Sequence, residues 1–586
     1  MDRKGITAVS LAIAVLLGWM YWNNQEMTKA AAQQATVKAA AAEAAAQTKA
    51  TEPVAPVAAT PAAAPVVPAV PAAEEKREAL SGPSVDYVFS NLGGGIATAR
   101  LKTHEAERGT RMTLNEFGSI PIGAITDAAG DEVQARAPFE TKVEDGSVTF
   151  DRTDARQLQL TKKFTVPNST DLTKDYIVTL DVTFTNRGAQ PLTLPGYFVH
   201  TGSAAPVHQR DLATYTGFKY QGGKFIDASY FTSGWFHPER PVFTVAQPGI
   251  AWAGVADQYF TTLVTPQWTE TVAGVPAISR STGAWAKRFV IDDAAWKQAG
   301  RSAEGNTLAR YGIDGALGMP GLTLDPGKSV TQTFRIYAGP REYGRLRLMA
   351  EDQADIMDFG TFGLVSKTLL NSMNWLHGKL GSYAIAIIVL TLCIKCLLWP
   401  MQNKSTQSMK RMQLLQPKMT EIREKYKDDP TRMNTEVMKL YKDYGVNPLS
   451  GCLPMLIQMP IFFGFFGMLG KAVELRNSTF LWVPDLSLPD TIAHLPGLGW
   501  PINILPLVMA GTMLWQMMLS PKSGDPMQQR MMMFMPLIFI AFCYNYASAL
   551  ALYWTVQNLF SVAQLYLTRN QAAPTLQKVP APAKKK

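Results

Sequence analysis

The chain has 586 residues, of which 47% are hydrophobic and 18% charged, and its formal net charge is +9. This length exceeds one ordinary domain. The sequence contains no Walker A motif, no H-E-x-x-H and no G-x-S-x-G, which argues against an ATP-driven pump and a membrane protease. The six histidines are scattered. We therefore expect a protein that is not an enzyme and has neither cofactor nor metal.

Two segments precede the first folded region. Residues 1–27 contain an apolar run that follows Arg3 and Lys4 and ends at Trp19, Tyr21 and Trp22. The run is longer than the core of a signal peptide and closes with interfacial aromatics, which favours an uncleaved membrane anchor over a cleaved signal. Residues 28–80 are rich in Ala and Pro, which predicts an extended linker.

Residues 81–345 carry the signals of an all-β domain. Alternating apolar side chains run from Tyr176 to Phe184, and the stretches 157–166 and 329–339 read in the same way. Alternation with period two, with turn residues between the runs, predicts an antiparallel β-sandwich. The four cysteines all lie after residue 390, so this domain must fold without disulfides.

The second half of the chain reads as helical and membrane-bound. Residues 360–380 have apolar side chains at spacings of three and four, which predicts an amphipathic helix at the membrane surface. Apolar spans follow at 383–400, 451–470, 501–519, 530–547 and 549–567. With the anchor they make six spans. Basic residues crowd into 402–442 and the tail 568–586, so the positive-inside rule places both termini in the cytoplasm and the β-domain outside.

Residues 402–446 predict a helical hairpin between the second and third spans. Apolar residues recur at heptad spacing in two stretches, and Asp429-Pro430 between them is an N-cap followed by Pro at the first helical position. Acidic residues are mixed with the basic ones here, which argues against sequence-specific nucleic-acid binding. We expect a cytoplasmic docking element, or alternatively a merely solvated hairpin.

Lys395 lies within the second span and is the candidate functional residue. A charge at the bilayer centre costs roughly 2.5–3.5 kcal/mol on insertion scales. Two interpretations remain open: the ammonium reaches the cytoplasmic interface near Pro400, or it faces a water-filled cavity. Polar residues available to line such a cavity are Thr391, Gln458, Gln516, Gln557, Asn558, Ser561 and Gln564. No carboxylate lies within the five spans, which disfavours a proton-coupled transporter.

Three motifs resemble the YidC family of membrane protein insertases: NPLSGCLPMLIQMPIFFGFF at 447–466, QPKM at 416–419 and DPMQQRMMMFMPLIF at 525–539. The resemblance covers about residues 360–569, and the β-domain is similar to that of the Gram-negative members, a super-sandwich related to sugar mutarotases. It implies that Lys395 occupies the position of a groove arginine. It also implies that Thr391, Met459 and Trp554 contact the inserting segment and that Gln516 lies in the groove.

The resemblance implies an insertase and chaperone of the inner membrane in a Gram-negative bacterium. Its partners would be nascent membrane proteins, the Sec translocon, the lipid bilayer and the ribosome, the last through the hairpin, the loop 520–529 and the basic tail. Two alternatives are a tethered domain that binds or processes carbohydrate and a small-solute transporter.

Overall fold

The computed structural model describes residues 74–107, 109–208, 211–232, 238–267, 281–301, 310–446, 453–496, 500–520 and 526–568. The anchor expected at 1–27, the linker up to residue 73 and the tail from residue 569 lie outside the described residues. So do residues 521–525 of the loop expected at 520–529.

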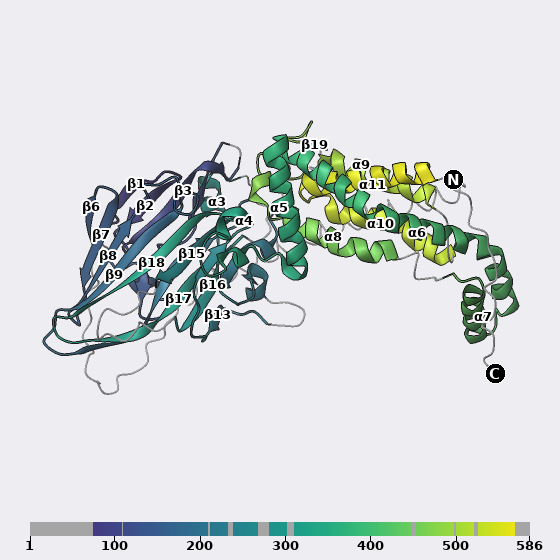
Figure 1. Cartoon of the computed structure of the whole chain (residues 1–586). Coiled ribbons are helices and arrows are strands. Elements are labelled where there is room, and N and C mark those ends of the chain that lie inside the picture. Colours follow the sequence, from purple (N-terminus) through teal and green to yellow (C-terminus); the bar gives the residue numbers. More distant parts are fainter. Residues whose placement is uncertain are drawn as a thin grey trace, which may run out of the picture. The chain divides into compact units, whose positions relative to one another are not determined.

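The region before residue 341 is built mainly of antiparallel strands (Figure 1). Its described part contains a nine-stranded sheet of order β12-β11-β14-β15-β18-β9-β8-β7-β6, a five-stranded sheet β13-β16-β17-β10-β5 and a four-stranded sheet β1-β2-β3-β4. The strands are β1 (Arg77–Ser81), β2 (Val85–Ser90), β3 (Gly95–Glu105), β4 (Arg111–Leu114), β5 (Ile125–Thr126), β6 (Glu140–Glu144), β7 (Ser147–Thr153), β8 (Leu158–Thr165), β9 (Ile177–Asn186), β10 (Leu192–Ala204), β11 (Gly217–Tyr220), β12 (Ile226–Asp227), β13 (Val242–Val245), β14 (Ala253–Ala256), β15 (Phe260–Gln267), β16 (Gly283–Val290), β17 (Tyr311–Leu324) and β18 (Ser329–Pro340).

Strand β9 shows how the alternating pattern produces this region. Its residues alternate between half-buried and buried along the whole strand, and it pairs with β8 on one side and β18 on the other. Buried Phe184 packs against Tyr197 of β10, with ring centroids 4.9 Å apart, and so joins the nine-stranded sheet to the five-stranded one. Two facing sheets with apolar inner surfaces are the architecture that the alternation predicts. The expected mostly-sheet region is confirmed.

The boundary expected between linker and β-domain is wrong by several residues. The composition predicts a linker up to residue 80, whereas β1 begins at Arg77 and pairs along its length with β2. The segment REALS is an edge strand whose side chains are mostly exposed. An exposed edge strand has no buried face, and for that reason its sequence lacks the apolar alternation that marks the inner strands.

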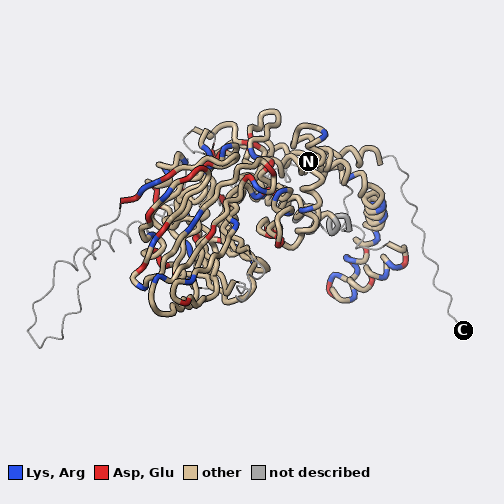
Figure 2. Tube along the Cα trace, turned by 60° about the vertical axis from the view of Figure 1, so that its left-hand side comes forward, with Lys and Arg blue, Asp and Glu red and all other residues tan. Residues whose placement is uncertain are grey.

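The part of the chain after residue 341 is mainly helical. Its helices are α4 (Tyr343–Leu346), α5 (Gly363–Leu380), α6 (Tyr383–Lys425), α7 (Pro430–Asp443), α8 (Leu453–Leu469), α9 (Ile504–Leu519), α10 (Pro526–Cys543) and α11 (Ser548–Thr568), with 3-10 turns η3 (Gln353–Met357), η4 (Gly360–Phe362) and η6 (Val473–Leu475). The sheet region contains the short helices α2 (Glu132–Ala135) and α3 (Asp293–Gln298) and the 3-10 turns η1 (Ala213–Tyr215) and η2 (Ala228–Phe231). Helix α5 packs closely on α8 at Gly464. A Cβ at this position would lie 2.6 Å from a methyl carbon of Val365, so the close approach requires glycine. Figure 2 shows few charged residues along the helices next to the sheet region, and many along the second half of α6 and along α7.

Helix α6 corrects the expected division between a span at 383–400 and a separate hairpin at 402–446. It runs without interruption through Pro400 and Pro417 for 43 residues. Proline in a helix interior removes one hydrogen bond and costs about 3 kcal/mol. Trp399 packs edge-on against Phe560 of α11, so contacts with a neighbouring helix support α6 beside Pro400. Such support is a usual reason why an apolar helix tolerates proline.

The second half of α6 and α7 pack against each other through a small apolar cluster. Leu415 and Met419 of α6 meet Tyr441 of α7 and Val446, three residues beyond the end of α7. The Asp429 side chain accepts a hydrogen bond from the backbone of Arg432, and Pro430 opens α7, which confirms the predicted N-cap. The side of the membrane on which this pair of helices lies stays a prediction.

The region before α9 also differs from the expectation. Residues 501–503, assigned to the span 501–519, form strand β20 (Pro501–Asn503), which pairs with β19 (Thr491–His494), and the helix begins at Ile504. In the described part of the chain, α6 is the helix long and apolar enough to cross a membrane. Shorter apolar helices lie at Gln458–Leu469, Ile504–Leu519 and Phe534–Cys543, and the count of six spans stays a prediction.

Candidate functional site

Lys395 is held between two helices. It lies on α6, and its Nζ donates a hydrogen bond to Oγ of Ser561 on α11, at 3.2 Å. Ser561 Oγ in turn donates to the backbone carbonyl of Gln557, 2.9 Å away. No carboxylate of the described residues pairs with the Lys395 ammonium. Within the described part of the chain the lysine therefore has a polar partner but no counter-charge.

A polar cavity adjoins this contact. Its volume is about 40 Å³, and Ser561 is one of its lining residues. A single water needs roughly 10–15 Å³ by the same measure, so there is room for about two or three. The lining, in which six of eight residues are polar, comes from α6, the C-terminal end of α9 and α11: Gln402, Thr406, Met409, Gln516, Ser520, Ser561, Gln564 and Leu565.

Gln564 marks this cavity as a place suited to water or to a polar chain. Its side chain is buried, and its Nε2 has no hydrogen-bond partner among the described residues. A buried amide donor without a partner costs about 1–3 kcal/mol. Because the same side chain lines the cavity, a water or a substrate oxygen bound there would offset that cost.

A second set of side chains joins α8 to α11 one turn further along. Gln458 Nε2 donates to Oε1 of Gln557 at 2.8 Å and to the hydroxyl of Tyr553 at 3.1 Å. Gln557 belongs to both sets, since its backbone carbonyl accepts from Ser561. Lys395, Ser561, Gln557 and Gln458 thus form a continuous polar path across three helices.

The remaining predicted site residues have other surroundings. Thr391 is buried and donates to the carbonyl of Ile387 within its own helix. Asn558 fastens α11 to α9 by donating to Thr512 Oγ1 at 3.1 Å. Trp554 packs among aromatic rings, with Phe462 and Phe539 at 4.7 and 4.6 Å. Met459 is 41% exposed on the outside of α8.

Sequence reasoning overlooked Gln402 and Thr406 as cavity residues because it assigned 402–446 to a separate hairpin. They follow Lys395 by seven and eleven residues, so continuation of the helix puts all three on one face. Cys393 and Cys396 are exposed on α6.

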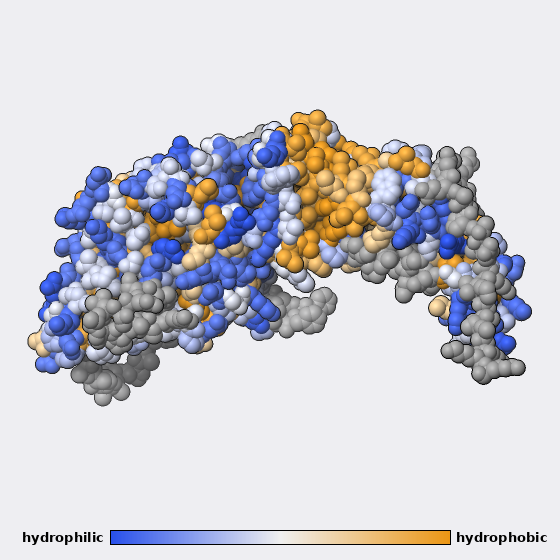
Figure 3. All heavy atoms as spheres, in the orientation of Figure 1, coloured by the Kyte–Doolittle hydropathy of each residue, from blue (hydrophilic) through white to orange (hydrophobic). Residues whose placement is uncertain are grey.

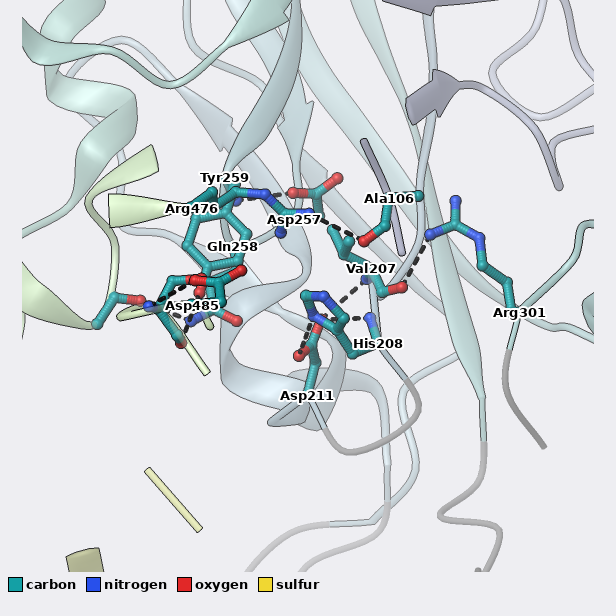
Figure 4. A network of polar contacts seen from close by, with 12 residues as sticks. Ala106, Val207, His208, Asp211, Asp257, Gln258, Tyr259, Arg301, Arg476 and Asp485 are labelled. Atoms are coloured by element: carbon teal, nitrogen blue, oxygen red, sulfur yellow. Dashed lines mark hydrogen bonds and ion pairs between the residues drawn. The ribbon is translucent and has the colours of Figure 1, made fainter. Parts of the chain in front are cut away.

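A second polar network lies where the sheet region meets the turn after α8 (Figure 4). Arg476 donates to the backbone carbonyls of Glu105 and Ala106, at 2.5 and 2.9 Å, and its guanidinium lies 4.7 Å from the ring centroid of Tyr259. Gln258 Nε2 donates to the carbonyl of Gly470 at 2.7 Å. Nearby, burial raises the pKa of Asp257 to about 6. The contacts join sheet and helices and contain no pairing of nucleophile and base.

Two family profiles match most of the chain. The profile of the YidC periplasmic domain matches residues 78–372, and that of the 60Kd inner membrane protein matches residues 375–575. The chain is 30% identical over 516 residues to the membrane protein insertase YidC of Syntrophus aciditrophicus, covering 85% of this chain and 86% of that protein.

It is 43% identical over 253 residues to the membrane protein insertase YidC of Syntrophobacter fumaroxidans, covering 42% of this chain and 46% of the relative. A solved structure, the active YidC insertase crystal structure with the first transmembrane domain resolved, is similar at 18% identity and a TM-score of 0.34. The similarity covers 85% of this chain and 94% of that one.

Proposed function

This chain belongs to the YidC family of membrane protein insertases, and from this premise we propose that it inserts membrane proteins into the inner membrane through a groove centred on Lys395. The family assignment rests on the two profiles, which together match most of the chain, and on the relative aligned over 86% of its length. Insertion makes and breaks no covalent bond, so the protein is not an enzyme. The assignment favours this function over a carbohydrate enzyme and a solute transporter.

One observation carries the groove: the Lys395 ammonium hydrogen-bonds to Ser561, which lines a polar cavity between helices that are otherwise apolar. A half-buried lysine among apolar helices and without a counter-charge is costly unless water or a partner solvates it. The cavity supplies room for the water. An acidic group of the substrate would supply the counter-charge during insertion.

The energetics of insertion need no nucleotide. A substrate helix of about 20 apolar residues gains roughly 0.3–0.6 kcal/mol for each strongly apolar residue moved into lipid. The barrier is the passage of a polar tail through hydrocarbon. A hydrated path from Gln402 and Thr406 to Lys395 would shorten the dry part of that passage, because water and polar side chains, and not hydrocarbon, would surround the tail along it.

Lys395 would act by electrostatic attraction. A carboxylate in the translocated tail would be drawn toward the ammonium, while Gln564 and Gln516 supply hydrogen bonds to its backbone. An outside-positive membrane potential adds about 2.3 kcal/mol per 100 mV for each negative charge that crosses outward. The apolar helix would then leave sideways into lipid past the exposed Met459 and the aromatic rings around Trp554.

The finer topology belongs to the same proposal. We infer six spans, with both termini in the cytoplasm and the sheet region in the periplasm, from the basic residues of α6, α7 and the tail. The pair formed by α7 and the end of α6, with the loop 520–529 and the tail 568–586, would bind the ribosome. A chaperone role and cooperation with the Sec translocon would follow from the same lateral exit.

Site-specific photo-crosslinking tests the groove. A photoreactive residue replaces Met459 or Trp554, and a membrane protein is stalled during translation on vesicles that contain the variant. We expect crosslinks to the stalled chain from both positions and none from Val133, which is 87% exposed in the sheet region. Insertion that proceeds without crosslinks from either groove position would contradict the proposed path.

A further inference from the structure

A tight turn between α8 and α9 presents two large apolar side chains. Phe480 and Val483 face each other as an isolated antiparallel bridge, with N–H···O distances of 2.8 and 2.7 Å in the two directions. Leu481 and Trp482 form the tip between them and are 76% and 43% exposed. Large apolar residues at a turn tip are unusual, since Gly, Asn and Asp are the residues that turns favour.

The backbone of Leu481 adopts a strained conformation. Its φ is +50°, in the left-handed region, where a bulky side chain crowds the following carbonyl. Glycine or asparagine would adopt this conformation at lower cost. Because Leu481 is largely exposed, packing inside the protein does not compensate for the strain. A strained, exposed leucine of this kind indicates a contact outside the chain.

The position of the tip indicates what it contacts. Trp482 Nε1 donates to Oδ2 of fully buried Asp490, at 3.1 Å, and the same oxygen accepts from the backbone N–H of Leu505 at 2.7 Å. The tip is therefore fastened to the first turn of α9. Outward residues of that turn and the next, Leu507 and Val508, are 50% and 38% exposed. The tip thus lies at the end of an apolar helix, where a bilayer passes from hydrocarbon to headgroups.

The surrounding surface is also apolar. Ile492 of β19 is 52% exposed. In Figure 3 the apolar surface of the helices continues over the place where Figure 1 labels β19 and ends at the hydrophilic sheet region. Tryptophan is enriched at this boundary because its ring is apolar and its N–H is polar.

We propose that the Leu481–Trp482 tip inserts into the outer-leaflet interface of the bilayer and anchors the segment that joins α8 to α9. The proposal rests on the membrane placement of the helices in the proposed function. Its consequence is positional: the tip would set the depth of α9 and, through it, the depth of the cavity that Gln516 and Ser520 help to line.

Depth-dependent fluorescence quenching tests the proposal on the full chain. All four native cysteines are first replaced: Cys393, Cys396, Cys452 and Cys543. An environment-sensitive dye is then attached to Leu481→Cys, to Leu514→Cys on the exposed side of α9 as a membrane reference, or to Val133→Cys in the sheet region as an aqueous reference. The protein is reconstituted into phosphatidylcholine–phosphatidylglycerol vesicles with nitroxides at shallow or deep acyl positions.

We expect the dye at position 481 to emit at shorter wavelength than at position 133, and shallow nitroxides to quench it more than deep ones. Quenching at 514 with none at 481, together with aqueous iodide quenching at 481 as strong as at 133, would overturn the anchor and leave the insertase function intact. Loss of lipid quenching at both 481 and 514 would overturn the membrane placement itself. Trp482→Cys, labelled in the same way, is a second test if Leu481→Cys does not fold.

Discussion

Reversing the charge at Lys395 should block insertion of membrane proteins with acidic tails. The Lys395 ammonium is held 3.2 Å from Ser561 beside the cavity, so a carboxylate in the cavity that contacts the Ser561 hydroxyl would lie within about 6 Å of it. Two unit charges at this distance attract by about 3 kcal/mol at an effective dielectric constant of about 20. Lys395→Glu removes that attraction and replaces it with repulsion.

Loss of the attraction alone corresponds to about a 100-fold slower crossing, because each 1.4 kcal/mol is a tenfold change in rate. The effect should shrink for a substrate with a neutral tail, since there is no carboxylate to attract. Lys395→Arg keeps the charge and should support insertion at close to the normal rate. The more diffuse guanidinium changes the hydrogen-bond geometry more than the electrostatic attraction.

The assay follows protease protection of a reporter with two acidic residues in its translocated tail, in vesicles that contain equal amounts of each variant. Lys404→Glu is the matched control, because Lys404 lies nine residues further along α6 and its side chain is exposed. It makes the same change of charge outside the cavity. Equal insertion of the acidic reporter by wild type and Lys395→Glu would refute the electrostatic role.

Three further predictions concern stability, each measured on the full chain in detergent. Burial raises the pKa of Asp314 to about 7, so the wild-type fold loses stability as the pH rises from about 4 through 7. Asp314→Asn should therefore raise Tm at pH 8 but not at pH 4. The gain in the free energy of unfolding at pH 8 should be up to about 4 kcal/mol. An equal effect at both pH values would contradict this reasoning. Leu415 is a fully buried residue of the α6–α7 cluster, so Leu415→Ala should lower the free energy of unfolding by about 2–5 kcal/mol and expose residues 402–446 to protease. Leu414→Ala, at the exposed neighbouring position, should have neither effect. Equal cleavage of the two variants would show that the cluster does not hold the two helices together. Arg476→Ala leaves two backbone carbonyls of the sheet region without their donor, which should cost about 1–3 kcal/mol; a Tm unchanged from wild type would mean that this junction contributes nothing to stability.

The spacing of apolar residues along the sequence predicted elements such as β9 and the second half of α6, which bury one face. The alternation at 176–184 predicts β9, and the heptad spacing at 412–426 predicts the apolar face of α6 that meets α7, because side-chain direction follows from the backbone period alone. Pattern failed where no face is buried, as in the edge strand β1, and where packing overrides local preference, as at Pro400 inside α6.

The candidate site divides in the same way. An isolated lysine in an apolar run marked Lys395 as exceptional without any structure, since its cost in hydrocarbon is a property of the residue itself. Its partner lies 166 residues away on α11, and Gln458 meets Gln557 across 99 residues. No local period relates such residues. Polar residues on several helices were candidates of equal standing, and Asn558 and Thr391 proved to have structural partners within the helices.

By itself the sequence determined that the chain has a sheet region, a group of apolar helices and one charge that needs an explanation. The tertiary structure decided what surrounds that charge: Ser561 as its partner, a cavity of about 40 Å³ beside it, and no carboxylate among the described residues that neutralises it. The physical reason is that burial and periodicity determine which face of a helix turns inward. Which inward faces meet depends on how all the helices pack together.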